Sequence, residues 1–252
     1  MAIKRILVSQ PEPKSKKSPY FELAERNNLE IDFKPFIKVE GIGEKEFRKT
    51  RINIQDHNAV ILTSRTSIDH FFRICEEMRV NVPDSLKYFC TSESVAYYLQ
   101  KYITYRKRKI FYANGKFASL VDLIKKHEDE NFLIPLSDCH KKEIPNLLDK
   151  NKINYTKAIL YKTISCNLDD IQHRNYDMFV FYSPSGIKSL LENFPEFKQD
   201  SIKIASFGPN TAKAVKNKGL RLDVKAPTIK APSMTMALEQ YIKKINSNGH
   251  DK

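Results

Sequence analysis

Short apolar runs alternate with helix-like stretches along the second half of the chain. One run, Met178 to Tyr182, ends at Ser183-Pro184-Ser185-Gly186, and a stretch with helical spacing of apolar positions follows. A second run, Ile204 to Phe207, ends at Gly208-Pro209-Asn210-Thr211 and is followed by another such stretch. Apolar runs of this length, bounded by turn residues, are typical of strands buried in a parallel sheet. The pattern predicts successive strand–turn–helix units.

The first half of the chain repeats this pattern. The run Ala59 to Leu62 ends at Thr63-Ser64, and the run Tyr88 to Cys90 ends at Thr91, each ahead of a helix-like stretch. Two similar halves predict an α/β protein with two similar lobes, each a parallel sheet flanked by helices. Because open α/β sheets bind ligands where their strands end, we expect the lobes to present their strand-to-helix turns to a common cleft.

A strand, a helix and an extended segment occur at the N-terminus and again in the middle of the chain. The N-terminal copy consists of a strand at Ile6–Val8, a helix from Tyr20 to Asn27 and an extended segment at Pro35–Val39. The second copy consists of strand Phe132–Pro135, helix Glu143–Leu148, strand Ile153–Tyr155 and extended segment Ala158–Thr163.

This repetition predicts a discontinuous lobe. The second copy completes the first half, and the second half lacks a copy of its own. We therefore expect residues 1–36 to pack with residues 165–252, and residues 40–160 to form a continuous lobe. The chain would cross between the lobes twice, at residues 35–39 and 160–164. Two extended crossings side by side would form a two-stranded linker and a natural hinge.

The composition excludes some functional classes. The chain has 252 residues and a formal net charge of +13, which attracts polyanions in general. Two basic runs, Lys14–Lys17 and Arg106–Lys109, are predicted to be solvated loop edges, and no zinc-finger spacing, RNP-type aromatic motif or basic heptad repeat is present. No apolar run is long enough to span a membrane, and the N-terminus reads as a strand rather than a signal peptide. We expect no nucleic acid and no membrane as partners.

The cysteines are scattered in the sequence. They show neither metal-ligand spacing nor a disulfide framework, which indicates a reducing cytoplasm and no metal. The four positions are Cys75, Cys90, Cys139 and Cys166.

Several segments, taken together and in order, resemble the uroporphyrinogen-III synthase family. They are Leu160–Thr163, Phe181–Gly186, Phe207–Ala212, Ala226–Thr228 and a final helix with Met234, Met236, Ala237, Leu238 and Tyr241. The resemblance covers nearly the whole chain and implies the two-lobed HemD-like fold.

The resemblance also implies an activity. Such an enzyme would act on hydroxymethylbilane, a linear tetrapyrrole that carries many carboxylates. It would remove the terminal hydroxyl as water, invert ring D and close the macrocycle as uroporphyrinogen III, using no cofactor and no metal. We expect a cytoplasmic monomer whose main task is to hold the substrate in the geometry of ring closure.

The resemblance places substrate-binding groups at the helix starts, where unpaired backbone N–H groups and helix dipoles favour anions. Gly186 and Gly208 would let the ligand approach the backbone. The expected substrate-binding residues are Thr63, Ser64, Ser94, Ser183, Ser185, Gly186, Gly208 and Thr211. The alternative is that such residues only cap helices, with Ser94, Ser185 and Asn210 as N-caps.

Tyr161 matches a tyrosine that the family keeps at the lobe crossing. It is the expected catalytic residue, as a general acid or a positioning group for the departing hydroxyl. The alternative is that it packs against the linker. Lys141, Lys142 and Arg65 could pair with carboxylates but are expected to be exposed charges, and the loop residue His140 receives no role.

Three positions depart from the family pattern. Gln10 and Leu136-Ser137-Asp138 stand where arginines are usual, and Thr91 stands where a glycine is usual. They leave open an alternative function, a catalytically inactive two-lobed binding or regulatory homologue. A third reading, a nucleic-acid-associated module, depends on the net charge alone.

Overall fold

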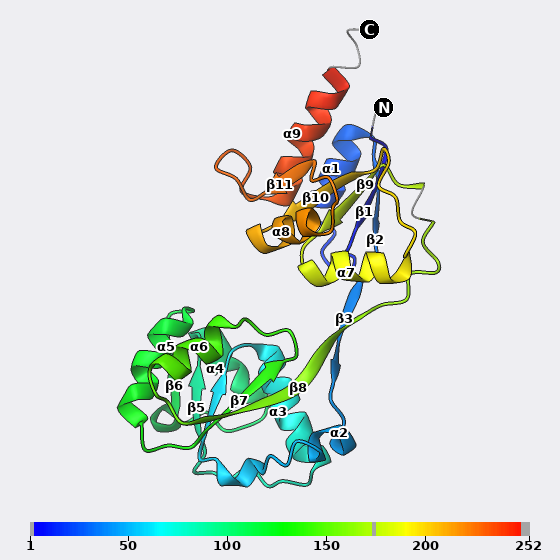
Figure 1. The fold of residues 1–252 in the computed structure, drawn as a ribbon. Helices are drawn as coiled ribbons and strands as arrows, with labels where there is room; N and C mark the ends of the chain where they lie inside the picture. The colour runs from blue at the N-terminus through cyan, green and yellow to red at the C-terminus, as the bar shows by residue number, and fades with distance from the viewer. Residues whose placement is uncertain (1–2, 173–174, 248–252) are drawn as a thin grey trace. The chain divides into compact units, whose positions relative to one another are not determined.

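The chain folds as two compact units. The computed structural model describes residues 3–172 and 175–247. The discontinuous unit combines Met1–Lys38 with Ile164–Lys252, and the continuous unit is Val39–Thr163. Each unit is an α/β structure with its own sheet and its own helices (Figure 1).

The discontinuous unit contains a parallel sheet whose strands are not in sequence order. Its order is β11 (Val224–Ala226), β10 (Lys203–Phe207), β9 (Met178–Phe181), β1 (Arg5–Val8), β2 (Glu30–Phe33). All four pairs of neighbours are parallel. Its helices are α1 (Pro19–Asn27), α7 (Pro184–Asn193), α8 (Pro209–Asn217) and α9 (Met234–Ser247). In Figure 1 the blue strands β1 and β2 lie in one sheet with β9, β10 and β11, which are yellow-green to orange.

Strand β1 lies inside this sheet, between β2 and β9, and β9 is far away in the sequence. It pairs with β9 over Ile6 to Val8, and Asp177 strengthens the start of the ladder. The Asp177 carboxylate accepts hydrogen bonds from the backbone N–H groups of Lys4 and Arg5, at 2.7 and 2.9 Å. The Asp177 N–H donates to the Arg5 carbonyl at 2.9 Å. The N-terminal segment is therefore an integral part of this sheet.

Alternate residues of the strands fill two apolar layers, one on each face of the sheet, because successive side chains point to opposite faces. Ile6 and Val180 pack with helices α1 and α9. Leu7 and Phe179 pack on the other face with α7 and α8. Burial on both faces explains why these strands read as continuous apolar runs.

The continuous unit has a six-stranded sheet. Its order is β3 (Ile37–Gly41), β8 (Tyr155–Ser165), β7 (Phe132–Ser137), β4 (Ala59–Leu62), β5 (Lys87–Cys90), β6 (Ile110–Tyr112). The pairs from β8 to β6 are parallel. The helices are α2 (Glu44–Arg48), α3 (Arg65–Glu77), α4 (Glu93–Tyr98), α5 (Phe117–Ile124) and α6 (Glu143–Lys150). Short 3-10 turns occur at Ile54–Asp56, Leu99–Lys101, Lys107–Lys109 and Lys125–His127.

This sheet is also buried on both faces. Val60 and Leu62 pack with α3 and α4, whereas Ala59 and Ile61 pack with α5 and α6. None of the four apolar clusters described in the two units draws residues from both of them.

The structure corrects one expected boundary. The sequence suggested a strand at Ile153–Tyr155 and a separate extended segment at Ala158–Thr163, but β8 is a single strand from Tyr155 to Ser165. Thr156 and Lys157, which lie between the two expected segments, pair in register with β7, so nothing ends the strand there.

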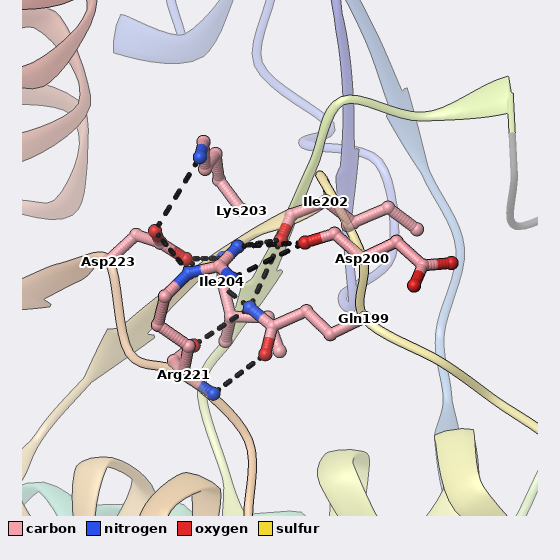
Figure 2. A network of polar contacts seen from close by, with 7 residues as sticks. All are labelled: Gln199, Asp200, Ile202, Lys203, Ile204, Arg221 and Asp223. Atoms are coloured by element: carbon pink, nitrogen blue, oxygen red, sulfur yellow. Dashed lines mark hydrogen bonds and ion pairs between the residues drawn. The ribbon is translucent and has the colours of Figure 1, made fainter.

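A polar network joins the loops at the starting ends of β10 and β11 (Figure 2). The Asp223 carboxylate is almost fully buried and accepts from Arg221 Nε at 3.0 Å and from the Ile204 N–H at 2.9 Å. The Gln199 amide donates to the carbonyls of Ile202 and Arg221, at 3.0 and 2.9 Å. These contacts satisfy polar groups that a sheet edge would otherwise leave unpaired. They lie at the end of the strands opposite to the strand-to-helix turns, so we assign them a structural role.

We propose that each unit is a separate folding domain. Because each apolar cluster is confined to one unit, limited proteolysis near Val39 and Thr163 should release a middle fragment that stays folded. A polypeptide of residues 39–163 should likewise unfold cooperatively on heating, as followed by circular dichroism. The proposal fails if this polypeptide is unfolded and recovers its structure only when residues 1–36 are included.

Candidate functional site

A cavity lies at the carboxyl ends of the strands of the continuous unit. Its volume is about 580 Å³. Thr63 follows β4, Thr91 follows β5, and Leu136 and Tyr161 come from β7 and β8. Since this is the edge at which open α/β sheets bind ligands, the cavity is the candidate site of this unit.

A β-bulge aims Tyr161 at this cavity. Leu136 pairs with Ile159 and Ser137 pairs with Tyr161, so Leu160 has no partner in β7. An extra residue in one strand changes the face to which the following side chains point. As a result Leu160 and Tyr161 both pack in the same apolar cluster, although they are adjacent in the sequence.

Tyr161 is 8% exposed, and its ring stacks on the His70 ring of α3. The ring centroids are 4.8 Å apart and the ring planes are 16° from parallel. Burial raises the pKa of the Tyr161 phenol, and a hydrogen bond with the Ser64 side chain lowers it in part. The phenol is therefore protonated at neutral pH and can donate a hydrogen bond, as a general acid must.

Thr63 and Ser64 form the turn between β4 and α3. The Ser64 hydroxyl accepts from the Ser67 N–H at 3.1 Å, and the Ser67 hydroxyl accepts from the N–H groups of both Thr63 and Ser64. This is a capping arrangement that holds the start of α3 in place. Ser67 is not among the site residues expected from the sequence, although a small polar residue three positions after an N-cap is a recognisable signal.

Ser94 has neither the N-cap position nor a place in this cavity. The N-cap of α4 is Ser92, whose hydroxyl accepts from the Val95 N–H at 3.4 Å, and Ser94 Oγ lies 3.1 Å from Ser92 Oγ. The capping interpretation of Ser94 is therefore wrong. Ser94 and Ser92 line a second cavity of about 570 Å³, next to Asn114.

In the discontinuous unit Ser183 caps α7. Its hydroxyl accepts from the Gly186 N–H at 3.1 Å, so the N-cap expected at Ser185 lies two residues earlier and Ser185 is half-buried. Gly186 is buried, and a Cβ there would lie 3.4–3.6 Å from atoms of Phe181, Ser183 and Ser9. Protein atoms thus surround the Gly186 α-carbon.

The start of α8 is built differently. Gly208 is the N-cap, rather than Asn210, and its φ of +88° is a conformation that favours glycine. A Cβ at Gly208 would meet nothing within 4 Å, so space remains beside this backbone. Thr211, one turn into the helix, is only 3% exposed.

Other groups around the large cavity were missed or left without a role. Cys139, His140 and Lys141 follow β7, and Lys116 precedes α5. The His140 Nδ1 atom lies 2.7 Å from the Ser137 carbonyl. Two lysines at a cavity edge suit an anionic ligand, but loop positions after a strand carry no periodic signal that would have placed them. Lys142 and Arg65 are exposed, and Arg65 lies over the Tyr98 ring at 5.3 Å.

A pair of phenols was also missed. The hydroxyls of Tyr20 in α1 and Tyr182 after β9 are 2.5 Å apart. Burial raises the pKa of both tyrosines, so both are protonated at neutral pH. In the sequence Tyr182 belongs to an apolar run and Tyr20 to a predicted helix, and two residues so far apart give no joint signal.

Comparison with known proteins decides the family. The sequence profile described as uroporphyrinogen-III synthase HemD matches residues 18–236. The chain belongs to the uroporphyrinogen-III synthase family. Uroporphyrinogen-III synthase is a cofactor-independent lyase of porphyrin and heme biosynthesis that acts on hydroxymethylbilane.

Solved structures of uroporphyrinogen-III synthases share the fold. One from Helicobacter pylori is 15% identical with a TM-score of 0.58, over 96% of this chain and 100% of that chain. A mutant from the extremely thermophilic bacterium Thermus thermophilus is 15% identical with a TM-score of 0.56, over 96% and 99% of the two chains. A comparison with curated protein sequences gives no significant match. The predicted α/β architecture and the family resemblance are confirmed.

The three departures from the uroporphyrinogen-III synthase pattern have different surroundings. Gln10 is exposed, and Leu136 is a buried wall of the large cavity. The Thr91 hydroxyl donates to the Thr63 carbonyl at 3.1 Å and so ties the ends of β4 and β5 together. None of the three disturbs the strand ends of the uroporphyrinogen-III synthase fold.

Within the described residues, no helix is sufficiently long and apolar to cross a membrane. In that same part of the chain, no group of three or more His, Cys, Asp or Glu side chains is arranged to hold a metal ion. The absence of a cofactor and of a metal stays a prediction for this uroporphyrinogen-III synthase homologue.

Ser183→Ala should lower the free energy of unfolding by about 1 kcal/mol, because it removes the N-cap of α7. Ser185→Ala is the matched control, since it makes the same substitution two residues later at a serine that does not cap the helix. Urea denaturation of both variants measures the difference. Equal stability of the two variants would show that the cap contributes nothing.

Proposed function

We propose that this protein converts hydroxymethylbilane to uroporphyrinogen III and that Tyr161 is its general acid. The observation that carries the assignment of Tyr161 is its protonated phenol at the wall of a cavity of about 580 Å³, where a β-bulge orients the side chain. Membership of the uroporphyrinogen-III synthase family supports the reaction.

The proposed chemistry needs little from the protein besides geometry and one proton. The phenol donates a hydrogen bond to the terminal hydroxyl of the substrate, the C–O bond breaks and water leaves. Ring D is inverted as the macrocycle closes, and closure releases one proton from a pyrrole carbon, which balances the proton lost with water. The protein also holds the two ends of the linear substrate close together, and this proximity supplies the rest of the rate enhancement.

We propose that the carboxylates of the substrate bind at the turns after the strands. In the continuous unit these turns carry Thr63, Ser64 and, beside the second cavity, Ser94. Lys116 and Lys141 add positive charge at the edge of the large cavity. In the discontinuous unit the proposed residues are Ser183, Ser185, Gly186, Gly208 and Thr211.

The geometry supports these residues unequally. Gly208 has open space beside it, and Ser185 is only half-buried and does not cap the helix, so a ligand can approach both. The Ser183 hydroxyl is already engaged as a cap, and Thr211 is nearly buried. A common cleft for the two units stays a prediction. No observation favours the inactive homologue as an alternative function.

We further propose that the protein acts as a cytoplasmic monomer and does not bind nucleic acid. All four cysteines are free thiols, which suits a reducing compartment. Part of the basic run at residues 106–109 is engaged within the protein, because Arg106 pairs with the Asp84 carboxylate at 3.3 Å and Lys109 donates to the Asp84 carbonyl. Among the described side chains, the large exposed apolar ones come from separate segments; they are Val39, Tyr97, Tyr112, Ile229 and Met236.

The reaction is tested by mixing the protein with freshly generated hydroxymethylbilane, oxidising the products and resolving the isomers. We expect isomer III, whereas spontaneous closure without the protein gives isomer I. Isomer I alone, formed at the rate seen in buffer, would refute the proposed function.

Tyr161→Phe should slow the formation of isomer III by about 10²-fold, the low end for a general acid, because the substrate ionises readily. The variant keeps the ring that stacks on His70, so the melting temperature should stay close to that of the parent protein. Single-turnover measurement of isomer III formation gives the rate. A parental rate in the Phe variant would mean that Tyr161 only packs in the core.

A further inference from the structure

The Arg73 side chain of α3 joins the two strands at the edge of the continuous unit. Its Nη2 atom donates to the Ile42 carbonyl at 2.8 Å and to the Leu160 carbonyl at 3.2 Å. Ile42 follows directly after β3, and Leu160 is the bulged residue of β8. The Ile42 N–H donates to the same Leu160 carbonyl at 2.9 Å. One guanidinium thus holds the bulge and the adjoining strand in a fixed geometry.

Gly41 provides the space that the guanidinium occupies. A Cβ at Gly41 would lie 2.6 Å from Arg73 Cζ and 2.7 Å from Arg73 Nε, closer than real Cβ contacts. The φ of Gly41 is not in the left-handed region, so the backbone itself would accept another residue. An alanine at this position would therefore displace the flexible end of the Arg73 side chain rather than distort the strand.

Arg73 also orients the His70 ring. Its Nε atom donates to His70 Nδ1 at 3.1 Å, and its Nη1 atom pairs with Glu77 at 2.5 Å. Because Nδ1 accepts this hydrogen bond, the His70 ring is neutral, with its proton on Nε2. Burial and, second, the charge of Arg73 lower the pKa of His70, which agrees with a neutral ring.

The contacts form a continuous path from the strand edge to the phenol. Gly41 gives room to Arg73, Arg73 fixes His70, and the His70 ring stacks on the Tyr161 ring at 4.8 Å. Arg73 also binds the carbonyl of the residue that precedes Tyr161 in β8. The phenol is therefore held from two sides, through its backbone and through the face of its ring.

We propose that Arg73 and His70 are positioning residues for Tyr161, and that Gly41 is a glycine because Arg73 must lie against it. The catalytic part of this proposal rests on the proposed function of Tyr161. The placement of the ring does not, so the two can be tested separately.

The placement is tested by fluorine NMR of protein labelled with 3-fluorotyrosine. The Tyr161 resonance is the one that disappears in Tyr161→Phe, among the 12 tyrosines of the chain. Gly41→Ala should shift this resonance, because Arg73 and then His70 move and the ring-current environment of Tyr161 changes. Gly43→Ala is the matched control, since a Cβ at Gly43 meets nothing within 4 Å. An unmoved resonance in Gly41→Ala would overturn the proposal.

The catalytic part is tested by kinetics of isomer III formation. Gly41→Ala should lower kcat by about 10-fold to 10²-fold, as expected for a small misplacement of a reacting group, with little change in KM. The same substitution should have no further effect in the Tyr161→Phe background, because no phenol remains to be misplaced. A purely structural role would instead lower kcat in both backgrounds, and that result would overturn a positioning role.

A second variant keeps the test independent of the folding of Gly41→Ala. Arg73→Lys retains the charge but loses the planar donor fork that reaches Ile42, Leu160 and His70 together. It should shift the same resonance and show the same dependence on Tyr161. If the parent protein forms no isomer III, the proposed function fails, while the fluorine spectra still decide whether Arg73 places the ring.

Discussion

The pairing of β1 with β9 is the constraint on which the rest of the structure depends. The two strands are joined through Asp177, which lies 173 residues from Lys4 in the sequence. A chain that places its first strand in a sheet completed by its second half has to leave that sheet and return to it. It leaves along β3 and returns along β8, and these two strands are neighbours in the sheet of the continuous unit. The return strand carries Tyr161, so the topology of one unit determines where the candidate acid of the other is found.

The repeated turns and the candidate acid have different structural origins. Three of the turns use the same device, a serine N-cap whose hydroxyl accepts from the backbone N–H three residues later. These serines are Ser64, Ser92 and Ser183. The repeated turn pattern in the sequence therefore mainly reflects the N-capping of helices. Tyr161 owes its position to a bulge and to an arginine from a neighbouring helix, which have no counterpart among the repeated turns.

This difference explains what sequence reasoning could achieve. Apolar runs and turn residues predicted the α/β architecture because strands buried on both faces leave a clear pattern. The same pattern could not distinguish Ser92 from Ser94 as the cap of α4, since both are serines in one turn. It gave no warning of the bulge at Leu160, because an extra residue in a strand changes no apolar periodicity over so short a span. The contact between Gly41 and Arg73 joins residues of different elements, and the burial of Thr211 depends on the packing of α8, so neither is visible in a linear pattern.

The two parts of the discontinuous unit are synthesised at different times. β1 and β2 leave the ribosome first, but β9 follows roughly 10–30 s later at ordinary elongation rates of about 5–20 residues/s. In that interval residues 39–163 are complete and can collapse around their own apolar clusters. The apolar residues Ile6 to Val8 meanwhile lack their partner strand β9, so the open edge of β1 is a site for non-native association. The nascent chain is therefore most vulnerable at its N-terminal segment, and a chaperone that shields this segment would act before the second half has been made.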